Sequence, residues 1–373
     1  MENSQKVEFF FLILGNFCAH RGVPIFRLER AMEGPDVQTV FITGAAGFIG
    51  FHTAKRYLAD GWRVVGIDAM TQYYDPKLKE ARLAEIESSP NFLFYEARVE
   101  DEGFIKALMH EMSPDVVIHL AAQAGVRYSI DEPRSYVEAN LIGTFEVLEA
   151  ARHSKPAHLL IASTSSVYGA NKDMPYKEDA KADAPMSFYA ATKKAGEAMA
   201  HSYAHLYDIP TTMLRFFTVY GPWGRPDMAL FKFVDAILKD EPIDVYGQGE
   251  LYRDFTYIDD IVDGIVGLAS ASPDPASASL LEKTHMASDV APFRIVNIGN
   301  ETPVRLMDFI QSVERALGKT AKLNMMPIQP GDVEKTWAST MILEDLTGEE
   351  PQVDIDLGVS RFVDWYKSYH GMS

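Results

Sequence analysis

A glycine triplet between an apolar segment and an amphipathic segment constrains this chain more than any other feature. Residues 43–50 read TGAAGFIG, so Gly44, Gly47 and Gly50 follow the apolar run 39–43 at the spacing G-x-x-G-x-x-G. Glycine has no side chain, so the backbone can approach a phosphate, whose charge is met by the N–H groups and dipole of the following helix. The order of strand, glycine loop and helix predicts a dinucleotide-binding turn rather than an ordinary tight turn.

An acidic residue stands where such a turn needs one. Asp68 ends the next apolar run, 63–68, and lies 18 positions after Gly50. A carboxylate at this place accepts hydrogen bonds from a ribose diol and repels a 2′-phosphate. The loop and the acidic residue together predict NAD, rather than NADP, as the cofactor.

The chain continues with short apolar runs that alternate with amphipathic segments, which is typical of β-α-β units and a parallel sheet. We expect strands at residues 39–43, 63–68, 92–95, 116–121, 159–163, 212–216 and 294–298. We expect helices at residues 50–59, 133–153, 187–207, 304–317 and 359–369. The pattern predicts an α/β fold, with a doubly wound parallel Rossmann sheet and a smaller C-terminal α/β substrate lobe.

Composition excludes several classes of protein. The single cysteine, Cys18, excludes an internal disulfide and a cysteine-based zinc cluster. With 35 Lys+Arg and 53 Asp+Glu the net charge is −18, which disfavours binding to nucleic acid or to anionic lipid. The apolar run 9–17 is too short to span a membrane, and as a secretory signal it lacks a cleavage site, so we expect a cytoplasmic protein.

Two residues at helical spacing carry the candidate acid–base chemistry. Tyr189 and Lys193 stand in YAATK inside the expected helix 187–207, where positions i and i+4 share a face. A free tyrosine has a pKa of about 10, so a phenolate near neutral pH needs a shift worth about 4 kcal/mol. A buried ammonium and a positive nicotinamide ring would supply much of it. Tyr189 is the candidate base that takes a hydroxyl proton while hydride leaves the same carbon.

Several hydroxyl groups follow the expected strand 159–163. Residues 163–169 read STSSVYG, and hydroxyls at the carboxyl end of a parallel strand face the ligand crevice. They can orient a reacting oxygen and share its developing charge. Spacing alone does not decide which hydroxyl does so.

Longer motifs carry a resemblance to a known family. The glycine loop and HLAA at 119–122 resemble the extended short-chain dehydrogenase/reductases. TVYGPWGRPDMA at 218–229, GQGELYRDFTYIDD at 247–260, AQAGVRYS at 122–129 and PGDV at 330–333 resemble, more specifically, the UDP-glucuronate 4-epimerases. The resemblance covers nearly the whole chain from Val37 onward.

The resemblance implies roles for individual residues. Thr164 would be the catalytic hydroxyl, because it lies four positions before the tyrosine of VYG, beside Tyr189 and Lys193. Arg225 would face the sugar carboxylate and Arg253 the diphosphate. The sugar carboxylate would also contact Ser165, Ser166 and Thr218. The NAD-binding residues would be Gly44, Gly47, Phe48, Ile49, Gly50, Asp68, Ala121 and Lys193.

The implied reaction is an isomerisation. UDP-glucuronate would be oxidised at C4 by tightly bound NAD, turned over as a 4-keto sugar and reduced again to UDP-galacturonate, a precursor for polysaccharide biosynthesis. The alternatives are a UDP-glucuronate decarboxylase, another UDP-sugar 4-epimerase and, from a different class, a non-catalytic NAD-sensing protein. Retention of Tyr189 and Lys193 argues against the last of these.

The same reasoning predicts the organisation of the chain. Residues 1–36 would be an extension outside the fold, with Met32 as an ordinary initiator, and 37–220 the NAD-binding Rossmann domain. Residues 221–373 would mainly form the sugar-nucleotide lobe, with some segments returning to the Rossmann domain. The polar stretch 270–292 would be a surface loop. In this family the helices equivalent to 133–153 and 187–207 pair across a homodimer, which we expect here too.

Three positions depart from these patterns or compete with them. Arg98 stands where the family usually has an aspartate that contacts adenine, so it would either stack on that ring or point to solvent. His201 and His205 are four positions apart but have no third ligand, so we expect no metal site.

Overall fold

A computed structural model describes residues 37–274, 276, 287–329 and 333–372. The expected extension 1–36, with Cys18 and Met32, lies outside the described residues, as do residues 330–332 of the PGDV motif and residues 275 and 277–286 of the polar stretch 270–292. No helix in the described part of the chain is long and apolar enough to cross a membrane.

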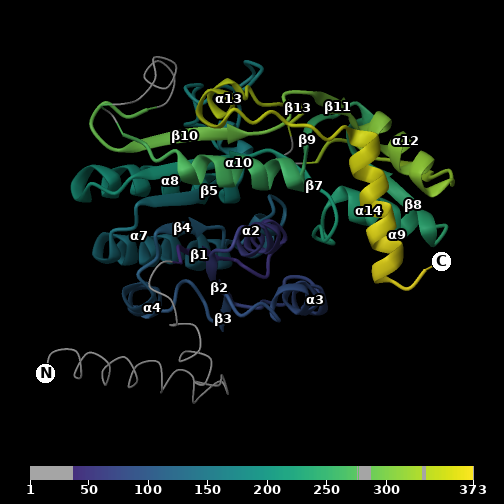
Figure 1. Cartoon of the computed structure of the whole chain (residues 1–373). Helices are drawn as coiled ribbons and strands as arrows, with labels where there is room; N and C mark the ends of the chain where they lie inside the picture. The colour runs from purple at the N-terminus through teal and green to yellow at the C-terminus, as the bar shows by residue number, and fades with distance from the viewer. Residues whose placement is uncertain (1–36, 275, 277–286, 330–332, 373) are drawn as a thin grey trace, which may run out of the picture.

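A seven-stranded parallel sheet forms the centre of the molecule, with strand order β10-β6-β5-β4-β1-β2-β3 (Figure 1). The strands are β1 (Thr39–Thr43), β2 (Arg63–Asp68), β3 (Phe92–Glu96), β4 (Val116–His119), β5 (His158–Thr164), β6 (Thr211–Phe216) and β10 (Phe293–Ile298). The order runs outward from β1 in both directions, which confirms the doubly wound Rossmann sheet. β4 ends two residues before the expected boundary because the chain then turns to line a cavity, where the N–H of Ala121 donates to the Thr43 hydroxyl at 3.1 Å.

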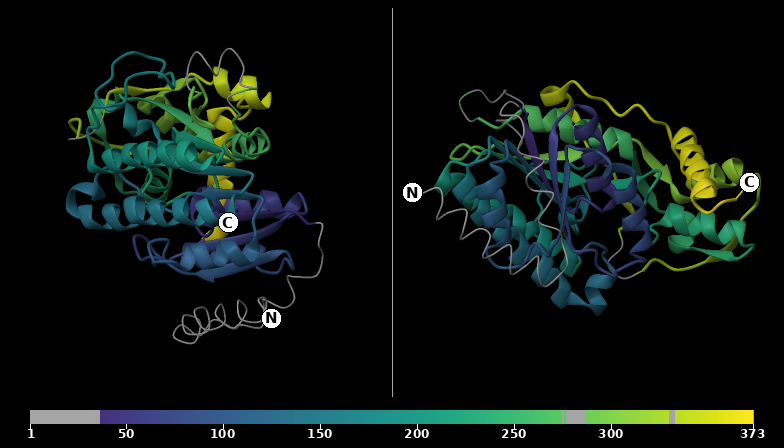
Figure 2. Two further views of the ribbon diagram at one scale, coloured as in Figure 1. Left: turned by 90° about the vertical axis from the view of Figure 1, so that its left-hand side faces the viewer. Right: turned by 60° about the horizontal axis from the view of Figure 1, so that its bottom comes forward.

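Helices cover both faces of this sheet (Figure 2). Val40 and Ile42 of β1 pack into one hydrophobic core with α2 (Phe48–Ala59), while Phe41 packs into the other. The first core also receives α10 (Ile258–Ser270), and the second receives α4 (Phe104–Met112), α7 (Gly143–Ser154) and α8 (Phe188–Tyr207). The alternation of neighbouring residues between two cores is why the strands read as continuous apolar runs.

The expected helix 133–153 is interrupted. It consists of α6 (Pro133–Tyr136), a π-helical turn (Val137–Ile142) and α7. The turn carries Asn140, whose buried side chain accepts the N–H of Gln123 at 2.8 Å and donates to the Gln123 carbonyl and the Thr192 hydroxyl, both at 3.0 Å. The extra residue of a π turn therefore lets one amide hold the chain after β4 against α8.

The chain from Thr218 onward makes two small sheets, which together with their helices are called here the C-terminal lobe, and it also returns to the main sheet. Short strands of this lobe make two small sheets, from β7 (Thr218–Tyr220), β9 (Tyr252–Tyr257), β11 (Pro303–Arg305) and β13 (Lys335–Thr336), and from β8 (Pro242–Val245) and β12 (Lys322–Met325). Its helices are α9 (Ala229–Leu238), α12 (Leu306–Leu317), α13 (Met341–Thr347) and α14 (Ile355–Tyr369). β10 and α10 return to the central sheet and to α2 (Figure 1).

Two expected helix boundaries in this lobe were wrong for local reasons. Residues 303–305 pair with β9 as β11, so α12 begins at Leu306. α14 begins at Ile355 rather than 359, because the carboxylate of Asp354 caps it by accepting the N–H of Leu357 at 2.9 Å.

Gly50 permits the close turn between β1 and α2. A Cβ atom at this position would lie 2.1 Å from the carbonyl oxygen of Gly44, which is backbone and cannot rotate away. Gly50→Ala is therefore expected to lower the free energy of unfolding by about 1–3 kcal/mol, as overpacking does. Urea unfolding followed by circular dichroism measures this change.

Gly196→Ala is the matched control. Gly196 lies inside α8, and a Cβ there would meet no atom within 4 Å apart from the neighbouring backbone of its own helix, so the helix should gain up to about 1 kcal/mol. Equal urea midpoints for the two variants would contradict this account of the turn.

Candidate active site

One cavity at the carboxyl end of the central strands gathers eleven of the predicted site residues. Its walls include Gly44, Gly47, Phe48, Ile49, Gly50, Asp68, Ala121, Thr164, Tyr189, Lys193 and Arg225. These residues come from the β1–α2 loop, the start of α2, the ends of β2 and β5, the segment after β4, α8 and the loop after β7. A crevice outside the carboxyl ends of parallel strands is where this sheet topology binds ligands.

The glycine loop is shaped to receive an anion. Gly44 has φ +75°, and a Cβ there would lie 2.8 Å from the backbone nitrogen of Ala121. α2 begins directly after Gly47, which offers no side-chain cap, and no acidic residue lies in its first turn. The N–H groups at the start of α2 therefore remain available for a phosphate, and the loop fits a dinucleotide.

Asp68 is held in place by a cation that the sequence analysis missed. Nζ of Lys79, on α3 (Lys77–Ile86), lies 2.8 Å from Oδ1 of Asp68, and both side chains are less than a tenth exposed. The N–H of Met70 donates to the same oxygen at 2.9 Å. Both contacts use Oδ1, so Oδ2 is the oxygen that a ribose hydroxyl would meet. Only the fold brings Lys79 here, since it follows Asp68 by 11 positions in another element.

Tyr189 and Lys193 lie at the start of α8, and both line the cavity. The helix begins after Ser187, whose hydroxyl accepts the N–H of Ala190 at 3.1 Å. Burial raises the pKa of Tyr189, whereas a hydrogen bond with Thr164 and the charge of Arg225 lower it. Burial also lowers the pKa of Lys193 to about 8.

The expected pairing of the Lys193 ammonium with the phenol differs from what the structure shows. Nζ of Lys193 donates to the carbonyl oxygen of Ala162, on β5, at 3.0 Å. In the structure the cation that lowers the pKa of Tyr189 is Arg225. Because burial has the largest effect, Tyr189 keeps its proton at neutral pH until another positive charge enters the site.

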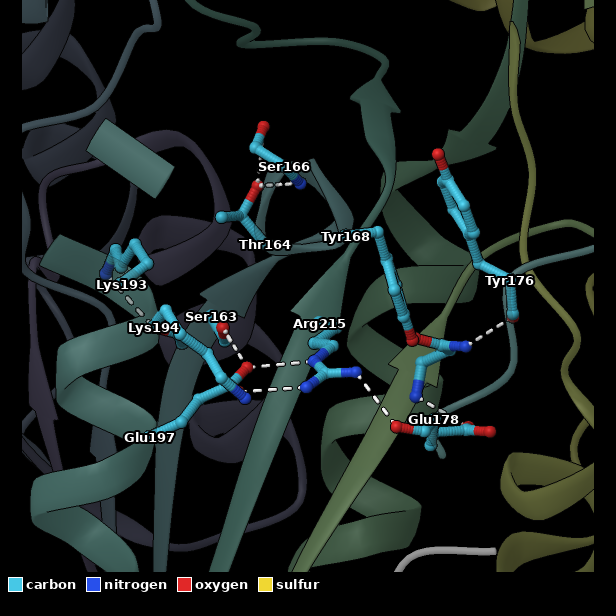
Figure 3. A network of polar contacts seen from close by, with 12 residues as sticks. Ser163, Thr164, Ser166, Tyr168, Tyr176, Glu178, Lys193, Lys194, Glu197 and Arg215 are labelled. Carbon is cyan, nitrogen blue, oxygen red and sulfur yellow. Dashed lines mark hydrogen bonds and ion pairs between the residues drawn. The ribbon is translucent and has the colours of Figure 1, made fainter. Parts of the chain in front are cut away.

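A buried ion pair between α8 and β6 lies close to Lys193 and Ser163 (Figure 3). Nε and Nη2 of Arg215, on β6, donate to the two carboxylate oxygens of Glu197 at 2.8 and 2.9 Å, and the two side chains are 1% and 2% exposed. Glu197 lies one turn after Lys193 on α8. It also accepts the hydroxyl of Ser163 at 2.7 Å, next to Thr164 at the end of β5. The pair therefore joins the element that carries Tyr189 to the strand that carries Thr164.

The same arginine reaches the segment that follows β5. Nη1 of Arg215 donates to the carbonyl of Glu178 at 3.1 Å, and its guanidinium lies 4.6 Å from the ring centre of Tyr168 (Figure 3). The hydroxyl of Tyr168 donates to Asn297 of β10 at 2.7 Å. Burial raises the pKa of Glu178, whose carboxylate accepts the N–H of Asn297, to about 7. This network links β6 and β10 to the segment that contains Tyr168 and Glu178.

The two basic residues of the expected substrate site lie in different places. Arg225 lines the main cavity, and its Nε and Nη2 contact the carboxylate of Asp227 at 2.9 and 2.5 Å, so one edge of its fork is already engaged. Arg253 lines a neighbouring cavity with Thr218 and Asp227. Tyr73 belongs to the walls of both cavities.

Ser165 and Ser166 lie outside the described walls of both cavities. The Thr164 hydroxyl donates to that of Ser166 at 3.3 Å and accepts the Ser166 N–H at 3.2 Å, so Ser166 is in direct contact with Thr164 (Figure 3).

Arg98 occupies the far end of the main cavity. It lies beyond Asp68, and Nη1 of its half-exposed side chain lies 2.9 Å from Oε1 of Glu100, which is 16% exposed. Both residues line the cavity, so Arg98 does not simply point away from it. The carboxylate of Glu100 is a second polar group at this end that the sequence analysis missed.

The histidines have structural roles. His119 is buried between the hydroxyls of Thr43 at 2.7 Å and Thr144 at 3.2 Å, and burial lowers its pKa to about 3, as expected for a packed residue. His201 contacts Ser288, and His205 contacts the carbonyl of Val290. The described residues contain no cluster of three metal-ligating side chains.

Loss of the Glu197 charge should damage the site and the fold together. Glu197→Gln leaves the Arg215 guanidinium buried without a counter-charge, so we expect the free energy of unfolding to fall by about 3–5 kcal/mol. Urea unfolding measures this change, with Lys194→Gln as the matched control.

Lys194 contacts the same carboxylate from a side chain that is 36% exposed. Its replacement should cost no more than about 1 kcal/mol. If the two variants were equally stable, the buried pair would not hold α8 in place.

Three comparisons relate this geometry to known proteins. Residues 40–278 match the model of the NAD dependent epimerase/dehydratase family. The chain is 56% identical over 326 residues to a probable UDP-glucuronate 4-epimerase of Rhizobium meliloti, covering 87% of this chain and 96% of that one. It is 42% identical over 337 residues to UDP-glucuronate 4-epimerase 5 of Arabidopsis thaliana, covering 89% and 76%.

A comparison with solved structures finds the same kind of protein. The crystal structure of UDP-glucuronic acid 4-epimerase from Bacillus cereus, in complex with UDP-glucuronic acid and NAD, superposes with a TM-score of 0.79 at 33% identity. The match covers 89% of this chain and all of that one. The glycine loop, the Tyr189 site and these matches lead to one conclusion: the chain belongs to the NAD dependent epimerase/dehydratase family.

Proposed function

We propose that this protein is a UDP-glucuronate 4-epimerase that interconverts UDP-glucuronate and UDP-galacturonate and retains NAD. The observation that carries the proposal is the meeting, in one cavity, of the glycine loop, Tyr189 with Thr164, and the cation of Arg225. The first feature suits a dinucleotide, the second suits proton transfer at a sugar hydroxyl, and the third suits an acidic sugar.

The residues of the glycine loop fit NAD. The N–H groups at the start of α2 would hold its diphosphate, Oδ2 of Asp68 a ribose hydroxyl, and Lys193 the nicotinamide ribose. When bound, NAD would supply reversible hydride transfer at C4 of the sugar. Ala121, Phe48 and Ile49 line the surrounding cavity.

Tyr189 handles the proton. Its phenol would take the proton of the 4-hydroxyl as the C4–H bond breaks, and return it when the bond re-forms on the other face. The hydroxyl of Thr164, which already interacts with Tyr189, would align the reacting oxygen. Lys193, with its pKa near 8, places a positive charge behind the site without leaving the Ala162 carbonyl.

The neighbouring cavity would receive the nucleotide. Arg253 would contact the diphosphate, and Thr218, which lines the same cavity, would contact the sugar carboxylate. Ser165 and Ser166 line neither cavity, so we no longer assign them to this carboxylate. Arg225 would offer this carboxylate the edge of its guanidinium that Asp227 does not use. Its charge matters because a 4-keto uronate is a β-keto acid, which loses carbon dioxide when its carboxylate aligns with the carbonyl π-system.

The same proposal covers the organisation of the chain and its assembly. Residues 37–220 would form the NAD-binding domain and 221–373 mainly the sugar-nucleotide lobe. Two copies would pair through the surface of α7 and α8, which pack against each other. Phe145 of α7 and Leu206 of α8 are exposed (44% and 63%), as are Ile142, Met186 and Phe188 in or next to these helices. Sedimentation at micromolar concentration distinguishes this homodimer from a monomer.

Product analysis tests the proposed function. Purified protein with UDP-glucuronate should give UDP-galacturonate and no UDP-pentose, as resolved by anion-exchange chromatography. Tyr189→Phe removes only the hydroxyl that carries the proton, so turnover should fall by a factor of about 10²–10⁴.

Three outcomes would contradict the assignment. UDP-pentose as the main product would indicate a decarboxylase, and equal turnover of UDP-glucose would indicate a less selective UDP-sugar epimerase. Unchanged turnover in Tyr189→Phe would exclude Tyr189 as the base.

A further inference from the structure

We propose that Arg82 is a positioning residue that sets how well Arg225 recognises a sugar carboxylate. The inference rests on the proposed function, because it assigns a task to Arg225. Arg82 itself lines neither cavity. It would act through the loop of residues 221–227, which carries Arg225, by holding that loop against the glycine loop.

Arg82 is a fully buried cation whose partners are neutral. Its Nε and Nη2 donate to the carbonyl oxygen of Trp223 at 3.2 and 2.6 Å. Its Nη1 donates to the carbonyl of Ala46 and to the hydroxyl of Tyr74, both at 2.9 Å. Within the described residues Arg82 forms no ion pair with a carboxylate. Buried arginines usually have such a partner, whereas the contacts of Arg82 are with the backbone of two separate segments and with one hydroxyl.

The two carbonyls that Arg82 joins belong to separate parts of the site. Ala46 lies in the middle of the glycine loop, and Trp223 lies two residues before Arg225. The planar guanidinium reaches both carbonyls at once, which the single ammonium of a lysine would not do with the same geometry. Arg82 therefore ties the dinucleotide loop directly to the Arg225 loop. Nε2 of His52, on α2, adds a second contact to the Arg225 loop, with the Pro222 carbonyl at 3.0 Å.

Trp223 has a backbone conformation that needs such support. Its φ of +62° lies in the left-handed region, where residues other than glycine are strained. Its ring packs edge-on against Phe51 and Tyr369, with centres 5.6 and 5.5 Å apart. Arg82 binds the carbonyl of the same residue, so both the ring and the backbone of Trp223 are fixed. These contacts define the direction in which the chain continues toward Arg225.

The segment just before Arg82 holds the other side of the loop. The hydroxyl of Tyr73 donates to Oδ2 of Asp227 at 3.2 Å, and Asp227 in turn holds Arg225. Residues 73–82 therefore hold the loop on both sides of Arg225. Arg82 contacts Trp223, which precedes Arg225, and Tyr73 contacts Asp227, which follows it. Without Arg82, the Trp223 carbonyl is released and the guanidinium of Arg225 loses its fixed place, although Asp227 still pairs with it.

A double-mutant cycle on ligand binding tests this role. The NAD-loaded wild type, Arg82→Met, Arg225→Met and the double variant are titrated calorimetrically with UDP-glucuronate and with UDP-glucose. Arg225→Met should weaken UDP-glucuronate binding by about 10- to 100-fold, the loss expected for a charge-assisted hydrogen bond, and leave UDP-glucose binding unchanged. Arg82→Met should weaken UDP-glucuronate binding selectively, by about tenfold.

The cycle separates a positioning role from general damage. If Arg82 acts through Arg225, the loss from Arg82→Met should disappear in the Arg225→Met background. Additive losses, or equal losses for both nucleotides, would overturn the proposal. The surface variant Arg56→Met is the matched control, because Arg56 is 41% exposed, and it should change neither affinity.

One further variant and the wild-type preference between the two nucleotides complete the test. Arg82→Lys retains the charge but not the double contact, and it should show a smaller selective loss; it replaces Arg82→Met if that variant does not fold. The proposed function fails separately: it would be wrong if the wild type did not prefer UDP-glucuronate to UDP-glucose. The inference fails if that preference depends on Arg225 but not on Arg82.

Discussion

The ion pair of Glu197 and Arg215 is the contact on which the geometry of this site depends. Both charges are buried, so each is stable there only because the other is present. Through Ser163 the pair joins α8 to the end of β5, and through the Glu178 carbonyl it reaches the segment that follows. This rigid contact therefore sets the relative positions of the Tyr189 phenol and the Thr164 hydroxyl, which must act on the same sugar oxygen. Rigid support of this kind is what proton transfer requires.

The charges of the molecule are also distributed in a way that favours binding in the cavities. The chain carries a net charge of −18, yet basic side chains gather around the cavities, with Lys79, Lys193 and Arg225 on the walls of one and Arg253 on the other. An acidic surface gives no general attraction for anions, so an anionic ligand is bound only where these cations are placed. Burial raises the pKa of Tyr189 and lowers that of Lys193, which favours the neutral form of each. A positive group that enters beside Tyr189 would therefore favour loss of its proton.

Sequence reasoning predicted the parts of the molecule that depend on local patterns. The bounds of β1 and β2, the glycine loop, and Asp68 followed from apolar runs and short spacings, and the Tyr189–Lys193 pair followed from helical periodicity. It did not find Lys79, Arg82, Asn140 or the pair of Glu197 and Arg215. Their partners lie between 11 and 141 positions away, and a contact between distant elements leaves no spacing in the sequence. The π turn was missed because its backbone is stabilised by the contacts of Asn140, while its apolar pattern is that of an ordinary helix.

The central claim is that one hydrogen leaves C4 of the sugar and returns to the same carbon inside a closed site. UDP-glucuronate carrying deuterium at C4 tests it most directly, with the product examined by mass spectrometry and proton NMR. The account predicts UDP-galacturonate that keeps the deuterium at C4 and takes up none from the solvent. Loss of the label to water would contradict it, because the hydrogen would then have left as an exchangeable proton.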